Sequence, residues 1–150
     1  MTQDTGSIAG IPQLAPAQAF ETLSGGDAAL VDVRTRAEWA WVGLPDLSPI
    51  GAQPVLVEWR RYPDMTANPG FVDQVLDALG DQPPAKVLFL CRSGGRSQEA
   101  ALAVSRALAE RGLTCECCNV AEGFEGDLGP DNRRGVVNGW KVRGLPWVQS

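Results

Sequence analysis

The chain has 150 residues, a hydrophobic content of 44% and a formal net charge of −5 at pH 7. A chain of this size can bury a core without disulfides or metals, and its acidity disfavours a general binder of nucleic acids or anionic membranes. It contains no histidine, which excludes Ser-His-Asp and Cys-His mechanisms and histidine-containing zinc sites. We predict neither a metal nor a cofactor.

The N-terminal region shows no sign of a signal peptide, and we expect a protein whose cysteines are reduced. We expect residues 1–10 to be flexible, residues 11–150 to form one domain, and residues 14–24 to form a helix. No stretch approaches the roughly 20 apolar residues of a membrane span, and the start, MTQDTGSIAG, lacks the basic and apolar regions of a signal peptide. We therefore predict a cytoplasmic location with free thiols.

Residues 28–34 (AALVDVR) are typical of a buried strand that ends in charge. Thr35 and Glu38 then have the spacing of a capping box, which predicts a short helix broken by Gly43 and Pro45. A second short strand is predicted over residues 55–59 (VLVEW). These segments alternate strand with helix.

The next elements continue this alternation. Asn68 and Pro69 resemble an N-cap and first turn for an amphipathic helix over residues 71–79. Residues 86–91 (KVLFLC) form a continuous apolar run, as expected of a central parallel strand covered on both faces. A helix over residues 97–111 follows, which Gly112 would terminate.

The C-terminal part predicts one more strand over residues 113–120 and a short final helix over residues 138–147. On that strand Cys115 and Cys117 would face one side and Cys118 the other. These three thiols are too close together to pair easily with one another. We interpret them as small core residues in preference to a resolving thiol.

The alternation of strands and helices predicts an α/β fold, a three-layer sandwich with a mostly parallel central sheet flanked by helices. In such sheets the functional loops follow the carboxyl ends of the strands. Four loops should therefore converge: Arg34, Glu58–Arg60, Cys91–Arg96 and Ala121–Phe124.

The loop CRSGGRS combines a cysteine with positive charge. Gly94 and Gly95 permit torsions that turn backbone amides inward, and the start of the following helix adds partial positive charge. Arg92 and Arg96 add full charges. Each feature favours the thiolate of Cys91, which therefore needs no histidine.

This loop resembles the active-site loop of the rhodanese-like sulfurtransferases, and the resemblance extends over roughly residues 12–148. Three weaker segments support it: VDVRTRAEW, NVAEGFEG and GWKVRGLPW. The family's Gly-His-Ile segment is replaced by WVGLPDL, without the histidine, which we take to be structural. Glu122 stands where a second glycine is frequent.

The resemblance implies sulfane sulfur transfer through a persulfide on Cys91, from an anionic donor such as thiosulfate to cyanide, a thiol or a protein. The predicted binding residues are Arg92, Ser93, Gly94, Gly95, Arg96, Ser97, Arg34, Trp59 and Arg60. For Arg34 we favour an ion pair with Asp32 that braces the fold near the site over a part in the chemistry. We expect neither nucleic-acid nor membrane partners.

Three alternatives stay open. The protein could be a persulfide carrier with little small-molecule turnover, docked through the basic segment 130–150. Independently of this, the three crowded thiols could include a second sulfur carrier. It could be a cysteine phosphatase or arsenate reductase, but these use Cys-x5-Arg, whereas Cys91 and Arg96 give Cys-x4-Arg. A catalytically silent interaction module is disfavoured by the presence of Cys91.

Overall fold

The computed structural model describes residues 10–150. Its centre is a five-stranded sheet in the order β1-β8-β7-β2-β4, in which all four pairings are parallel. The strands are β1 (Gln13–Leu14), β2 (Ala28–Asp32), β4 (Val55–Leu56), β7 (Lys86–Leu90) and β8 (Glu116–Val120). The predicted parallel sheet is confirmed, while the predicted flexible segment, Gly10 apart, lies outside the described residues.

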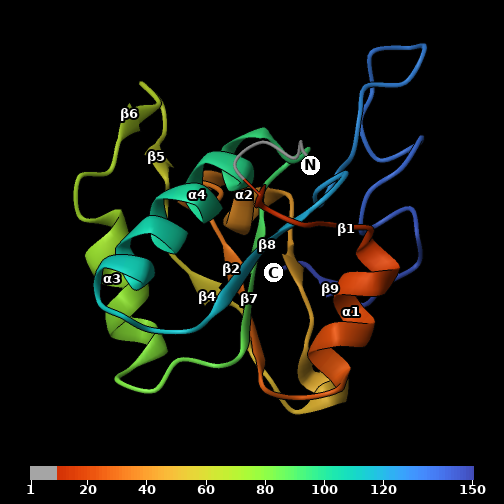
Figure 1. Cartoon of the computed structure of the whole chain (residues 1–150). Coiled ribbons are helices and arrows are strands. Elements are labelled where there is room, and N and C mark those ends of the chain that lie inside the picture. Colours follow the sequence, from red (N-terminus) through yellow and green to blue (C-terminus); the bar gives the residue numbers. More distant parts are fainter. Residues whose placement is uncertain (1–9) are drawn as a thin grey trace.

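Helices cover both faces of the sheet (Figure 1). They are α1 (Pro16–Ser24), α2 (Arg36–Trp41), α3 (Phe71–Leu79) and α4 (Gly95–Glu110), with a short 3-10 helix, η2 (Ser48–Ile50). Alternate residues of β7 divide the core: Val87 and Phe89 pack with α3 and α4, whereas Leu88 and Leu90 pack with α1. This division produces the predicted three layers.

Two small antiparallel sheets complete the fold. β3 (Leu44–Pro45) pairs with β9 (Trp147–Val148), and β5 (Arg60–Arg61) pairs with β6 (Thr66–Ala67). The strand predicted over residues 55–59 is present but shorter than predicted, because β4 ends at Leu56 and the chain then enters this hairpin.

The final helix predicted over residues 138–147 is wrong, since residues 138–146 form bends and turns that lead into β9. Trp140 is fully buried in the core, and its Nε1 donates to the carbonyl of Pro146 at 2.7 Å. Gly139 has a φ of +104°, and a Cβ there would lie 2.6 Å from the nitrogen of Gly126. Burial of the indole and this close approach hold the segment in an irregular path.

The start of α3 differs from the prediction as well. The N-cap is Gly70, two residues after the predicted Asn68. Asn68 still serves this end of the helix, because its Oδ1 accepts from the nitrogen of Gly70 at 3.1 Å. The capping box of α2 is confirmed: Thr35 and Glu38 each accept a hydrogen bond from the other's backbone nitrogen.

The clustered cysteines are core residues, as predicted. Cys117 packs on the α3–α4 face, with Cys115 partly buried against it, and Cys118 packs on the α1 face. Burial raises the pKa of Cys117 to about 12 and that of Cys118 to about 11. Within residues 10–150, none of the helices combines the length and apolar character needed to cross a membrane.

Candidate functional site

Cys91 follows β7 and lies at the base of the loop that leads into α4. Its Sγ accepts a hydrogen bond from the backbone nitrogen of Gly94 at 3.1 Å and lies 3.2 Å from the hydroxyl of Ser97. Gly94 has a φ of +114°, a conformation that favours glycine. The cysteine is only 1% exposed. The loop and the first turn of α4 therefore place two hydrogen-bond donors at a buried sulfur.

The segment after β8 packs directly against the cysteine loop. The nitrogen of Phe124 donates to the carbonyl of Cys91 at 2.8 Å, and that of Glu125 donates to the carbonyl of Arg92 at 3.0 Å. A Cβ on Gly123 would lie 2.5 Å from the backbone of Arg92. This position therefore requires glycine, and the predicted convergence of these two loops is confirmed.

Asn119 supports the loop from β8 and was not among the predicted site residues. It is 3% exposed, and its Oδ1 accepts from the Ser97 hydroxyl at 2.6 Å. Its Nδ2 donates to the carbonyl of Gly94 at 3.1 Å and to Oε1 of Gln13 at 2.8 Å. The single hydroxyl proton of Ser97 can point toward Asn119, the carbonyl of Gly94 or the Cys91 sulfur, so Ser97 can donate to a sulfur anion when one forms.

The two loop arginines differ in their charge partners. Arg96 donates to both carboxylate oxygens of Glu38, at 2.8 and 2.9 Å. Burial opposes ionisation of Glu38, but the hydrogen bonds and charge of Arg96 outweigh it and lower the pKa of the carboxyl. Arg92 is exposed and forms no ion pair among residues 10–150. Arg92 is therefore the loop arginine whose charge is free.

Arg34 is held by buried contacts. Its side chain is 0% exposed, its Nη2 lies 2.6 Å from Oδ2 of Asp32, and the same nitrogen donates to the carbonyl of Gly43 at 2.9 Å. Its guanidinium carbon stacks 4.3 Å above the ring of Phe124. These contacts brace β2 against the segment after β8, in line with the expected ion pair of Asp32 and Arg34, while a role of Arg34 in binding a substrate stays a prediction.

Trp59 and Arg60 make structural contacts. The Trp59 ring packs edge-on against Phe71 at 4.9 Å between centroids, and its Nε1 donates to Glu99 at 3.2 Å. Arg60 donates to the carbonyl of Met65 at 3.1 Å. Neither side chain lines either of the two pockets described below.

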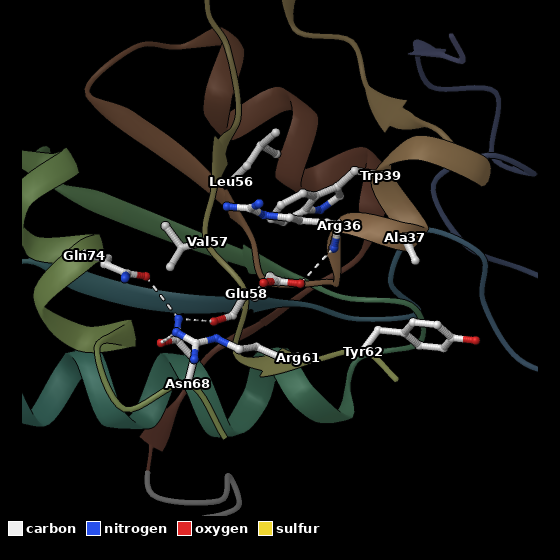
Figure 2. Close-up of a pocket in the computed structure, with 10 residues that line it drawn as sticks. All are labelled: Arg36, Ala37, Trp39, Leu56, Val57, Glu58, Arg61, Tyr62, Asn68 and Gln74. Carbon is white, nitrogen blue, oxygen red and sulfur yellow. Dashed lines mark hydrogen bonds between the residues drawn. The ribbon is translucent and has the colours of Figure 1, made fainter. Parts of the chain in front are cut away.

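One pocket lies beside the cysteine loop, and a second pocket adjoins the first. The first, the cysteine-loop pocket, has a volume of about 580 Å³. Its walls include Trp41, Tyr62, Arg92, Arg96, Glu125 and Arg134. The second, the arginine pocket, has a volume of about 480 Å³ and is lined by Arg36, Trp39, Glu58 and Arg61, among others (Figure 2). Tyr62 and Ala37 line both pockets, so the two cavities adjoin.

Glu122, which stands where a second glycine is frequent in the family, has contacts that account for a glutamate at this position. It has a φ of +71°, the conformation that glycine adopts most easily. Its Oε1 accepts from the nitrogen of Gly139 at 2.9 Å, and both carboxylate oxygens accept from Arg143 at 3.0 Å. The glutamate therefore ties the segment after β8 to the C-terminal turns.

Comparison with known proteins agrees with this geometry. The model of the Rhodanese-like domain family matches residues 15–128. The crystal structure of Rv0390 from M. tuberculosis is 43% identical, with a TM-score of 0.77, and the match covers 93% of this chain and 98% of that one. Uncharacterized protein RC0915 from Rickettsia conorii is 33% identical over 138 residues, 91% of this chain and 97% of its own length.

A more distant structure shares the fold alone. It is the protein of unknown function RPA3614 from Rhodopseudomonas palustris, described as a possible tyrosine phosphatase. It is 20% identical with a TM-score of 0.51, and the match covers 92% of this chain and 85% of that one. The family match and the two nearer relatives carry the assignment: this chain belongs to the rhodanese-like domain family.

Proposed function

We propose that the protein is a thiosulfate-type sulfurtransferase in which Cys91 carries the transferred sulfur. The observation that carries this proposal is the setting of the Cys91 sulfur, which accepts from the Gly94 amide at 3.1 Å and lies within reach of the Ser97 hydroxyl. Donors aimed at a sulfur stabilise an anion there, whether thiolate or persulfide.

The reaction would proceed in two displacements. The Cys91 thiolate attacks the outer sulfur of thiosulfate, the sulfur–sulfur bond of the donor breaks, and its electron pair leaves with sulfite. The enzyme is then a persulfide anion. A nucleophile such as cyanide or a thiol attacks the outer sulfur, which regenerates the Cys91 thiolate and releases thiocyanate or a new persulfide.

Arg92 would make the main charged contact with the donor. It belongs to the cysteine-loop pocket, is exposed and has no ion pair among the described residues. Arg96 lines the same pocket, but Glu38 holds it through two hydrogen bonds. We assign Arg96 to fixing the loop against α2, with a weaker effect on the donor.

Phosphatase chemistry is less well supported. Cys91 and Arg96 enclose four residues, one fewer than in the Cys-x5-Arg loop of cysteine phosphatases. The guanidinium that would hold a phosphoryl group is already paired with Glu38. We expect no hydrolysis of an aryl phosphate.

The experiment is replacement of Cys91 by serine. Cys91→Ser should abolish thiosulfate:cyanide transfer while leaving the circular dichroism spectrum and the urea midpoint close to wild type. Cys115→Ser is the matched control, because this half-buried thiol lies ahead of β8 and should be dispensable. Residual transfer by Cys91→Ser would refute the proposal. A wild-type protein that takes up one sulfur but turns over slowly with cyanide would instead favour the carrier alternative.

A further inference from the structure

We propose that the arginine pocket is the subsite for a carboxylate-bearing thiol acceptor, whose sulfur reaches the Cys91 persulfide through the cysteine-loop pocket. This inference rests on the proposed function for the identity of the reaction. The existence of the anion subsite rests on separate observations.

The charges of the arginine pocket favour an anion. Arg36 and Arg61 line it, and neither forms an ion pair within residues 10–150. Glu58 is the only carboxylate among the lining residues, and its Oε2 accepts from the backbone nitrogen of Arg36 at 2.9 Å. The pocket therefore carries a net positive charge in a protein whose overall charge is −5.

The arrangement of the side chains suits a carboxylate. Figure 2 shows the guanidinium groups of Arg36 and Arg61 extending toward the end of the pocket where Gln74 lies. Asn68 fixes Arg61 by accepting from its Nη2 at 2.8 Å, which leaves its other N–H groups for a ligand. Arginine binds carboxylates through paired N–H donors. Trp39 and Leu56 supply apolar walls for the methylene groups of such a ligand.

The position of the pocket indicates an elongated ligand. None of its lining residues comes from the cysteine loop, so a molecule held there must extend to reach the sulfur. Tyr62 and Ala37 line both pockets, so the ligand would have to pass these two side chains. Both volumes, about 480 and about 580 Å³, are in the range of small-molecule sites. An extended tripeptide spans about 10 Å, which makes a peptide thiol a suitable class of acceptor.

The direct test is binding of S-methylglutathione, a peptide with free carboxylates and a blocked sulfur, to the full chain by calorimetry at 0.15 M salt. Its diethyl ester, which lacks the carboxylate charges, is the ligand control. We expect the acid to bind roughly tenfold more tightly than the ester, the effect of one or two charge-assisted hydrogen bonds. Arg36→Gln and Arg61→Gln should each remove most of this preference.

Arg106→Gln is the matched protein control, because Arg106 is an exposed arginine of α4 outside both pockets. It should leave the preference for the acid unchanged. Equal binding of acid and ester, no binding of either, or an equal effect of Arg106→Gln would each overturn the subsite. A protein partner in place of a peptide thiol would also give no binding of either ligand.

The kinetic test separates the subsite from the proposed function. Cys91 persulfide formed with thiosulfate would be presented with glutathione or its diethyl ester as acceptor. The KM for glutathione should be lower, and Arg36→Gln should raise it roughly tenfold. Failure to form the persulfide would refute the proposed function while the calorimetry still tested the subsite. Formation of the persulfide with equal KM values for the two acceptors would refute the subsite alone.

Discussion

Replacement of Glu38 by glutamine tests how the cysteine loop is fixed against α2. Glu38 accepts from Arg96 at 2.8 and 2.9 Å and from the nitrogen of Thr35 at 3.1 Å. Glutamine keeps one carbonyl oxygen for Thr35 but turns an amide NH₂ toward the guanidinium. The side chains of Arg96 and Glu38 are 17% and 18% exposed. The pair therefore lies between a surface pair, worth about 0–1 kcal/mol, and a buried pair, whose disruption costs about 3–5 kcal/mol.

We expect Glu38→Gln to lower the free energy of unfolding by about 1–3 kcal/mol, measured by urea denaturation with tryptophan fluorescence. Lys86→Gln is the control, because it breaks a pair at 3.7 Å whose side chains are 46% and 51% exposed, and it should cost under about 0.5 kcal/mol. An equal cost for the two variants would refute the assignment of Arg96 to a structural role.

The pH dependence of Glu38→Gln follows from the lowered pKa of Glu38. A carboxyl whose pKa is lower in the folded state stabilises the protein above its unfolded pKa, and loses this effect as pH falls through the folded value. The stability difference between wild type and variant should therefore be full near neutral pH and shrink below the ordinary value of 4.5. A difference that grew on acidification would contradict this reasoning.

Although Glu38→Gln should lower the stability, it should strengthen the binding of thiosulfate. Removing the Glu38 charge leaves Arg96 unpaired beside Arg92 in the cysteine-loop pocket. The KM for thiosulfate should fall roughly two- to fivefold, as expected for one screened charge. A rise in KM would indicate that Arg96 needs Glu38 to stay in place.

Further predictions concern the core beneath the site. Asp32→Asn should lower the free energy of unfolding by about 3–5 kcal/mol in urea titrations, because it leaves the fully buried Arg34 without its counter-charge; a loss under about 1 kcal/mol would contradict this. Asn119→Ala should slow persulfide formation roughly tenfold in stopped-flow measurements with thiosulfate, because buried loop groups lose their partner; an unchanged rate would remove Asn119 from the site. Cys117 and Cys118, whose pKa values are raised to about 12 and about 11, should resist iodoacetamide at pH 8 in the folded protein and react in urea; rapid labelling of either thiol in the native protein would show that its face of β8 is open to the reagent.

Local patterns in the sequence were enough to predict much of the fold. The apolar run before Cys91, the capping box at Thr35 and Glu38, and the alternation on β8 all depend on near neighbours, and each prediction is confirmed. The final helix was wrong because the path of the C-terminal turns depends on a distant surface, the backbone around Gly126. Pairing of β1 with β8 also depends on residues far apart in the chain.

The site was predicted less completely than the fold. The position of the Cys91 loop could be predicted from the sequence, because glycines and arginines directly after an apolar strand indicate a turn that favours an anion, whatever the distant residues are. The partners of its arginines did not: Arg96 meets a carboxylate 58 residues away, and Arg34 is buried against Asp32. For Asn119, a polar residue within a buried strand was the one available signal, whereas nothing local predicted its contact with Gln13, 106 residues distant.

The most direct test of the proposed function is the mass of the protein after incubation with thiosulfate and removal of the excess donor. We predict an increase of one sulfur atom, located on the peptide that contains Cys91, reversed by cyanide and absent from Cys91→Ser. An unmodified Cys91 after treatment with thiosulfate and with other sulfane donors, or an added sulfur that persists in Cys91→Ser, would contradict the central claim that this cysteine carries the transferred sulfur.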